Sequence, residues 1–233
     1  HQGYRKWLAI IAEARGAPDL IHRKCGPHRD GAGDHPSSQC ENAPLTQEPP
    51  TLNPTARRLL DARRQGAPLA ALPEAERPAD AAAAYAVQDA VVAALGGIGG
   101  WKVGAASPAA EPACSPLPAA GVVASGHEFP PGAFRLNGLE AEIAFKLAFD
   151  LPPRGSPYGE EDVLAAIATV HPAIEILDSR FVDMRAVDPL SALADFGSHG
   201  ALVVGPGRTV DRRVDQTRQP VRLEAGERAL YEG

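Results

Sequence analysis

Cysteines, an excess of basic charge and long apolar runs are all scarce or absent in this chain, and each absence excludes a class of protein. The three cysteines, Cys25, Cys40 and Cys114, are scattered and odd in number, which argues against a disulfide framework. Acidic residues outnumber basic ones by 29 to 23, and this net charge of −6 argues against nucleic acid as a partner. No run approaches the roughly 20 apolar residues that span a membrane, so we expect no membrane partner. These features together favour the cytoplasm.

The first 52 residues differ in composition from the rest of the chain. They mix proline, glycine, serine, histidine and charged residues without sustained periodicity, which predicts an irregular or disordered arm over residues 1–52. Residues 3–15 predict at most a short amphipathic helix, and the apolar stretch at 8–12 is too short for a signal-peptide core. We therefore expect this arm to contribute nothing to the active site and the catalytic domain to comprise residues 53–233.

From Asn53 onward the sequence has regular helix and strand signals. Asn53 and Gly66 predict the two ends of a first helix, and Asp80 and Gly96 predict those of a second. Residues 159–170 predict a third helix. Strands are predicted around residues 101–105, 139–145, 172–177 and 201–204, with a further hairpin over 221–231. Because strands and helices do not alternate cleanly, an α+β fold is favoured over a doubly wound parallel sheet.

Three glutamates form the strongest chemical signal in the sequence. Glu140 and Glu142 lie two residues apart on a predicted strand, so both side chains point from the same face. Glu175 lies between Ile174 and Ile176, where a carboxylate is costly unless something pairs with it. A pair of glutamates at this spacing is most often the solvated face of an edge strand. Three oxygen donors without histidine or cysteine nearby favour Mg²⁺ or Mn²⁺ over zinc.

A series of short segments in fixed order extends this signal along the chain. In this order and composition the segments resemble the 2-keto-4-pentenoate hydratase branch of the fumarylacetoacetate hydrolase superfamily, over about residues 54–232. The segments are Gly-Trp-Lys-Val-Gly (100–104), Gly-Leu-Glu-Ala-Glu-Ile-Ala-Phe (138–145), Asp-Leu-Pro (150–152), Pro-Ala-Ile-Glu (172–175), Asp-Ser-Arg-Phe (178–181), Ala-Asp (194–195) and Ser-His-Gly-Ala (198–201).

The resemblance implies a mixed β-roll with flanking helices, and it implies a role for particular residues. It implies that Glu140, Glu142 and Glu175 hold a divalent metal and that Lys102 is an active-site residue. Many members of the family carry an acid in a Pro-Asp-Phe-Gly-like stretch, whereas this chain has Ser-Pro-Leu-Pro-Ala-Ala-Gly at 115–121. That departure puts the reaction in doubt rather than the metal.

Ser198 is a further, weaker candidate. With the backbone of the neighbouring Gly197 and Gly200 it could bind a substrate carboxylate, and an ordinary turn explains the same residues equally well.

The function implied is that of a lyase, a metal-dependent hydratase in aromatic catabolism. Its Mg²⁺ or Mn²⁺ would bind a 2-keto acid, and water would add to a 2-hydroxy-2,4-dienoate or 2-oxo-4-enoate. A 4-oxalocrotonate-type decarboxylase of the same family is the alternative. Family members continue beyond the position of Gly233, so a truncated, inactive fragment is a third hypothesis. We expect a homo-oligomer when the protein is full length.

Overall fold

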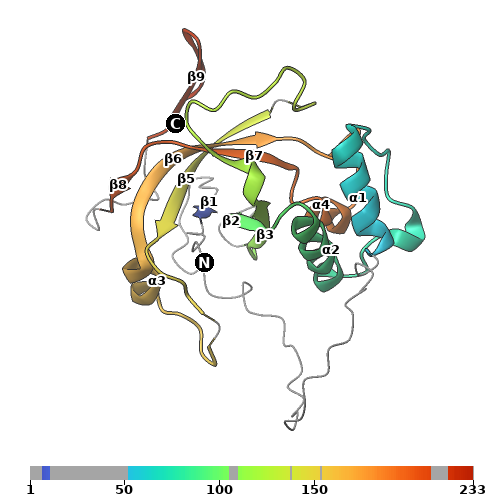
Figure 1. Cartoon of the computed structure of the whole chain (residues 1–233), viewed down its shortest axis with the longest axis horizontal. Coiled ribbons are helices and arrows are strands. Elements are labelled where there is room, and N and C mark those ends of the chain that lie inside the picture. Colours follow the sequence, from blue (N-terminus) through green and yellow to red (C-terminus); the bar gives the residue numbers. More distant parts are fainter. Residues whose placement is uncertain are drawn as a thin grey trace, which may run out of the picture.

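The computed structural model of the chain describes residues 7–10, 52–104, 110–136, 138–152, 154–210 and 220–232, and it shows an α+β fold (Figure 1). An eight-stranded mixed sheet has the order β3-β2-β1-β5-β6-β7-β4, with β8 paired to β6. Its strands are β1 (Trp7–Ile10), β2 (Ile98–Gly104), β3 (Ala113–Pro118), β4 (Val122–Ala124), β5 (Gly138–Leu147), β6 (Ile167–Leu177), β7 (His199–Val204) and β8 (Arg208–Thr209). Among the described strands of this sheet, β1–β2 and β4–β7 pair in parallel and the other pairs are antiparallel, which agrees with the prediction against a doubly wound fold.

Three helices gather beside one end of this sheet: α1 (Pro54–Gln65), α2 (Ala81–Ala94) and α4 (Pro189–Ala194) (Figure 1). The first two begin as predicted, because Asn53 accepts a hydrogen bond from the Thr55 amide at 2.8 Å and Asp80 accepts one from the Ala83 amide at 2.8 Å. Gly66 ends α1 in the left-handed conformation, with φ of 63°. Fully buried Leu, Val, Ala and Phe side chains of these helices and their loops form one core.

The predicted helix over residues 159–170 is wrong in its second half. Helix α3 (Glu160–Ala166) ends after seven residues, and β6 begins at Ile167. The segment from Ile167 contains β-branched residues and Pro172, and it pairs with β5 along its length. Strand pairing therefore overrides the helical periodicity.

The helix predicted over residues 3–15 is also wrong where the structure describes it. Residues 7–10 form β1, which pairs in parallel with β2 and antiparallel with β5. Ala9 lies in register with Lys102 on one side and with Ala144 on the other. The expectation that residues 1–52 are an irregular arm is corrected for this strand, whereas the expectation that they contribute nothing to the active site stays a prediction. The rest of residues 1–51 lies outside the described part.

Other elements were absent from the sequence prediction. Strands β3 and β4, the short 3₁₀ turns at Glu74–Glu76 and Ala119–Gly121, and helix α4 were not expected. Strand β3 contains Pro116 and Pro118, which a strand tolerates at the edge of a sheet, where β3 lies. These prolines obscured the strand signal.

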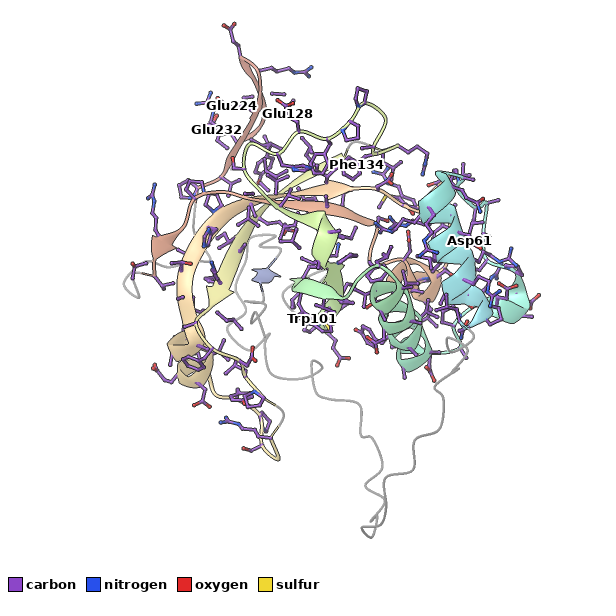
Figure 2. All side chains as sticks on the ribbon, viewed as in Figure 1. Asp61, Trp101, Glu128, Phe134, Glu224 and Glu232 are labelled. Atoms are coloured by element: carbon purple, nitrogen blue, oxygen red, sulfur yellow. The ribbon has the colours of Figure 1, made fainter. Side chains whose placement is uncertain are left out.

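The predicted hairpin over residues 221–231 is present as β9 (Arg222–Ala225) and β10 (Arg228–Glu232). Figure 2 shows Glu224 and Glu232 on this hairpin, at the margin of the molecule. Among the helices that the structure describes, none combines the length and apolar character needed to cross a membrane.

Candidate metal centre

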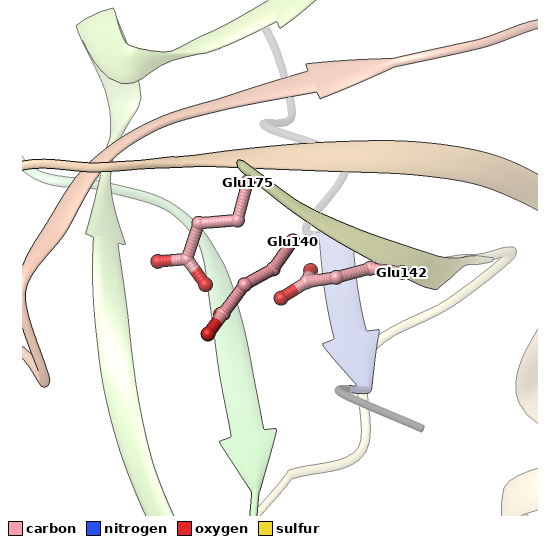
Figure 3. A group of neighbouring side chains, drawn as sticks. All are labelled: Glu140, Glu142 and Glu175. Carbon is pink, nitrogen blue, oxygen red and sulfur yellow. The ribbon is translucent and has the colours of Figure 1, made fainter. Parts of the chain in front are cut away.

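Glu140, Glu142 and Glu175 converge on one point of the sheet. Strands β5 and β6 are antiparallel, and Glu140 is directly opposite Glu175, so both side chains share a face with Glu142. One carboxylate oxygen from each residue lies within 4.8 Å of the others. Figure 3 shows the three carboxylates pointing toward one another from the two strands. The convergence expected from the spacing is therefore present.

Burial and missing hydrogen bonds make this cluster unusual for three acids. Glu142 and Glu175 are only 5% and 1% exposed, and Glu140 is half-buried. Both carboxyl oxygens of Glu142 and Oε2 of Glu175 are buried, and the only contact available to them among the described residues is the one between the two carboxyl groups themselves. Leaving such oxygens unpaired is expensive. A divalent cation with oxygen ligands would satisfy them, so the residues fit a hard cation such as Mg²⁺.

The surroundings of the carboxylates are apolar on one side. Leu117, Ala144, Ala173, Leu202 and Val204 form a buried cluster, which we call the apolar floor. Strand alternation puts Ala144 on the same face as Glu142, and Ala173 is opposite Glu142 in the register. Burial of the Glu142 carboxyl, followed by the negative charge of Glu175, raises its pKa to about 9.

Glu175 is in a different electrostatic environment. Lys102 Nζ donates to its Oε1 at 2.8 Å, and His199 Nδ1 lies 2.7 Å from the same oxygen. Burial alone would raise the pKa of Glu175, but the hydrogen bond from His199 and the charge of Lys102 outweigh it and lower the pKa to about 2. Glu175 is therefore ionised at neutral pH, with the buried ammonium group of Lys102 beside it.

The turn before β7 brings the donors together. Phe196, Gly197 and Ser198 all adopt left-handed backbone conformations, with φ of 57°, 56° and 63°. This conformation is uncommon for a residue other than glycine. The Gly197 carbonyl accepts a hydrogen bond from Lys102 Nζ at 3.2 Å. Ser198 is 3% exposed, and its carbonyl accepts a hydrogen bond from the Asp178 amide at 2.8 Å; its role in binding a substrate carboxylate stays a prediction.

Two arginines hold the backbone at His199. Arg63 of α1 donates to the His199 carbonyl at 2.7 Å, and Arg180 donates to it at 2.9 Å. Arg180 also forms a buried ion pair with Asp195, which in turn accepts from the Ser179 hydroxyl at 2.9 Å. The ion pair between Arg180 and Asp195 thus supports the turn before β7.

The region where the resembled family has an acid contains no carboxylate here. Leu117 is fully buried in the apolar floor. Ser115 lies directly opposite Lys102 in the β2–β3 register and is 3% exposed. Its hydroxyl oxygen accepts a hydrogen bond from Gln88 Nε2 of α2 at 3.1 Å. A hydroxyl group therefore lies opposite Lys102 in the register.

Sequence reasoning identified Lys102 and the three glutamates but gave no role to His199, Arg63 or Gln88. His199 follows Ser198 in a segment already noted, so its proximity to a site was detectable. Arg63 stands in the last turn of α1, where a basic residue ordinarily complements the helix dipole. The neighbouring sequence therefore gave no sign that Arg63 contacts the site.

Comparison with known proteins supports the fold. The chain matches no protein-family model and no curated protein. It is similar to solved structures of 4-oxalocrotonate decarboxylase from Pseudomonas putida G7. The complex with magnesium and adipate has 25% sequence identity and a TM-score of 0.58, and the match covers 70% of this chain and 65% of that chain. The complex with calcium and acetate has 25% identity and a TM-score of 0.56, covering 70% and 64%.

These similarities support the resemblance of the chain to the fumarylacetoacetate hydrolase superfamily. They do not distinguish the hydratase branch from the decarboxylases. The aligned part spans less than two thirds of the decarboxylase's own length.

Proposed function

We propose that this protein is a divalent-metal-dependent lyase of 2-keto acids, with Glu140, Glu142 and Glu175 as the metal ligands. The observation that carries the proposal is the convergence of three carboxylates beside Lys102, with those of Glu142 and Glu175 buried. A bound Mg²⁺ or Mn²⁺ would polarise the 2-keto oxygen and stabilise the negative charge of an enolate. The lead reaction is addition of water to a 2-hydroxy-2,4-dienoate in its 2-oxo-4-enoate form.

Lys102 has the position of a proton-transfer or carboxylate-binding group. Its ammonium carries three N–H donors, and two are used by Glu175 and the Gly197 carbonyl. The third is available for a substrate oxygen or for moving a proton at the substrate carbon. The Ser115 hydroxyl, opposite Lys102 in the strand register, offers a second polar group where the resembled family has an acid.

Room for a substrate chain exists at the end of the same strand pair. A hollow of about 350 Å³ is lined by Gly138 and Leu177, which pair two residues beyond Glu140 and Glu175. Its other lining residues include Leu136, Met184 and Arg185. We propose that the part of the substrate distant from the keto acid lies here. The cytoplasmic location and the homo-oligomeric state stay predictions.

Decarboxylation of 4-oxalocrotonate is the second candidate, because the similar solved structures are of a 4-oxalocrotonate decarboxylase. Both reactions pass through an enolate that the same ion and lysine would stabilise. Substrate choice therefore has to be measured.

The test is turnover with Mg²⁺ or Mn²⁺ on two substrates. Hydration of 2-hydroxypenta-2,4-dienoate supports the lead reaction, whereas CO₂ release from 4-oxalocrotonate without hydration moves the assignment to the decarboxylase. EDTA should abolish either activity. Lys102→Ala should lower kcat by about 10²–10⁴-fold, the usual contribution of a positioned acid or base.

Lys146→Ala is the matched control, since Lys146 lies on the same strand as the glutamates but four residues beyond Glu142. It should keep nearly full activity. Absence of turnover on both substrates by a folded, metal-loaded protein would contradict the proposal, and full activity of Lys102→Ala would remove that lysine from the mechanism.

A further inference from the structure

The two carboxylate oxygens of Glu175 differ in their hydrogen bonds. Oε1 receives both hydrogen bonds, from Lys102 at 2.8 Å and from His199 at 2.7 Å. Oε2 is buried and accepts no hydrogen bond from an N–H group of the described residues; the further contact of the Glu175 carboxylate is with the carboxyl group of Glu142. A carboxylate can accept on both oxygens, so this asymmetry fixes the rotation of the group. Oε2 is left as the oxygen available to a cation.

The proton in the His199 contact must be on Nδ1. An ionised carboxylate only accepts hydrogen bonds, so Nδ1 donates. Nε2 itself has no partner in the described part of the chain and lies near Gly121, where an added Cβ would be 3.8 Å away. The hydrogen bond to Glu175 is thus the one polar contact that the described structure gives the ring.

The two donors differ in how firmly they are held. Lys102 reaches Glu175 through a flexible four-carbon chain and is the group expected to turn toward substrate. The His199 side chain has only two rotatable bonds, is fully buried, and has its backbone carbonyl bound by Arg63 and Arg180. When Lys102 turns away, the donor that remains on Oε1 is His199.

From this geometry we propose that His199 is a positioning residue: its Nδ1–H orients Glu175 so that Oε2 serves as the single ligand oxygen. The proposal rests on the metal site put forward above and adds a residue to it. Groups that orient a metal ligand typically contribute about 10- to 100-fold to metal affinity. Arg63 and Arg180 act one step further away, by fixing the backbone that carries the imidazole.

The experiment compares His199→Leu with His199→Asn. Leucine fills similar space without a donor, whereas the asparagine amide can place an N–H near the Nδ1 position. Mn²⁺ affinity is measured by calorimetry at pH 7.5 and checked by the EPR signal of bound Mn²⁺. We expect His199→Leu to raise Kd by about 10- to 100-fold and His199→Asn to stay within about threefold of wild type.

Leu60→Ala in α1 is the control for stability, because Leu60 is a core residue outside the site. It should lower Tm while leaving Kd unchanged. Absence of Mn²⁺ binding by the wild-type protein would overturn the metal site itself. If the wild-type protein binds and His199→Leu binds equally well, only the positioning role is overturned. That role is also overturned if His199→Asn binds as weakly as His199→Leu.

Discussion

At the scale of single residues, the glutamates of one cluster differ sharply in charge state. Glu175 has a hydrogen-bonded histidine and a lysine, and its pKa is lowered to about 2. Glu142 lies over the apolar floor beside the negative charge of Glu175, and its pKa is raised to about 9. Two chemically identical side chains on neighbouring strands therefore hold different numbers of protons at neutral pH. Without a cation the cluster keeps a proton on Glu142.

We predict that metal binding releases about one proton per ion between pH 6 and pH 8. Glu142 is protonated before binding and must ionise to serve as a ligand, so the apparent Kd should fall by about tenfold for each pH unit in that range. Calorimetry of Mn²⁺ binding in buffers with different ionisation enthalpies gives the proton count. A Kd independent of pH, or zero protons released, would show that Glu142 is already ionised or is not a ligand. Glu142→Gln is the control and should release no proton.

At the scale of elements, the sequence predicted what short-range rules control. Asn53, Asp80 and Gly66 place helix ends through local capping, and these predictions are confirmed. The i, i+2 spacing on β5 likewise needs only strand geometry. The segment after Ala166 could not be assigned in this way, because its partner β5 lies about twenty residues earlier in the chain. Long-range pairing, rather than local propensity, decides between helix and strand there.

The candidate site shows the same division between local and long-range information. Lys102 and the glutamates stand out through their neighbours in sequence. The partners of Glu175 come from β2 and the start of β7. One of the two arginines that donate to the His199 carbonyl, Arg63, comes from α1, 136 residues away. Only the folded sheet and its helices bring these groups together. Ser115 became notable solely through its register with Lys102.

We predict that strand β1 supports the candidate metal site. It lies between the strand of Lys102 and the strand of Glu140 and Glu142, paired with both. Ala9→Pro removes a backbone N–H from this position and should lower Tm and raise the Kd for Mn²⁺ by about tenfold or more, as loss of support around a metal site does. Ala9→Ser keeps the N–H and serves as the control. Unchanged Kd and Tm in Ala9→Pro would show that β1 does not support the site.

At the scale of the whole molecule, the metal site links stability to function. Burial of the Glu142 carboxyl beside the negative charge of Glu175 destabilises the metal-free fold when Glu142 ionises, and a cation that binds both stabilises the folded state over the unfolded one. Because the pKa of Glu142 is raised from 4.5 to about 9, the folded metal-free protein holds a proton that the unfolded chain has lost between those values. Stability of the metal-free protein therefore falls as pH rises through that window.

We predict that thermal unfolding shows this loss of stability in the metal-free protein. At pH 8, Mg²⁺ or Mn²⁺ at about 100 times Kd should add about 2.7 kcal/mol and raise Tm by several degrees, and EDTA should reverse the shift. Glu142→Gln carries no titrating carboxyl, so without metal its Tm should exceed that of wild type at pH 8 and approach it at pH 5. Because glutamine supplies no charge to a cation, metal should shift the Tm of this variant little. The prediction is contradicted if the wild-type Tm changes with neither metal nor pH and Glu142→Gln is no more stable than wild type. The glutamate cluster would then not destabilise the metal-free protein.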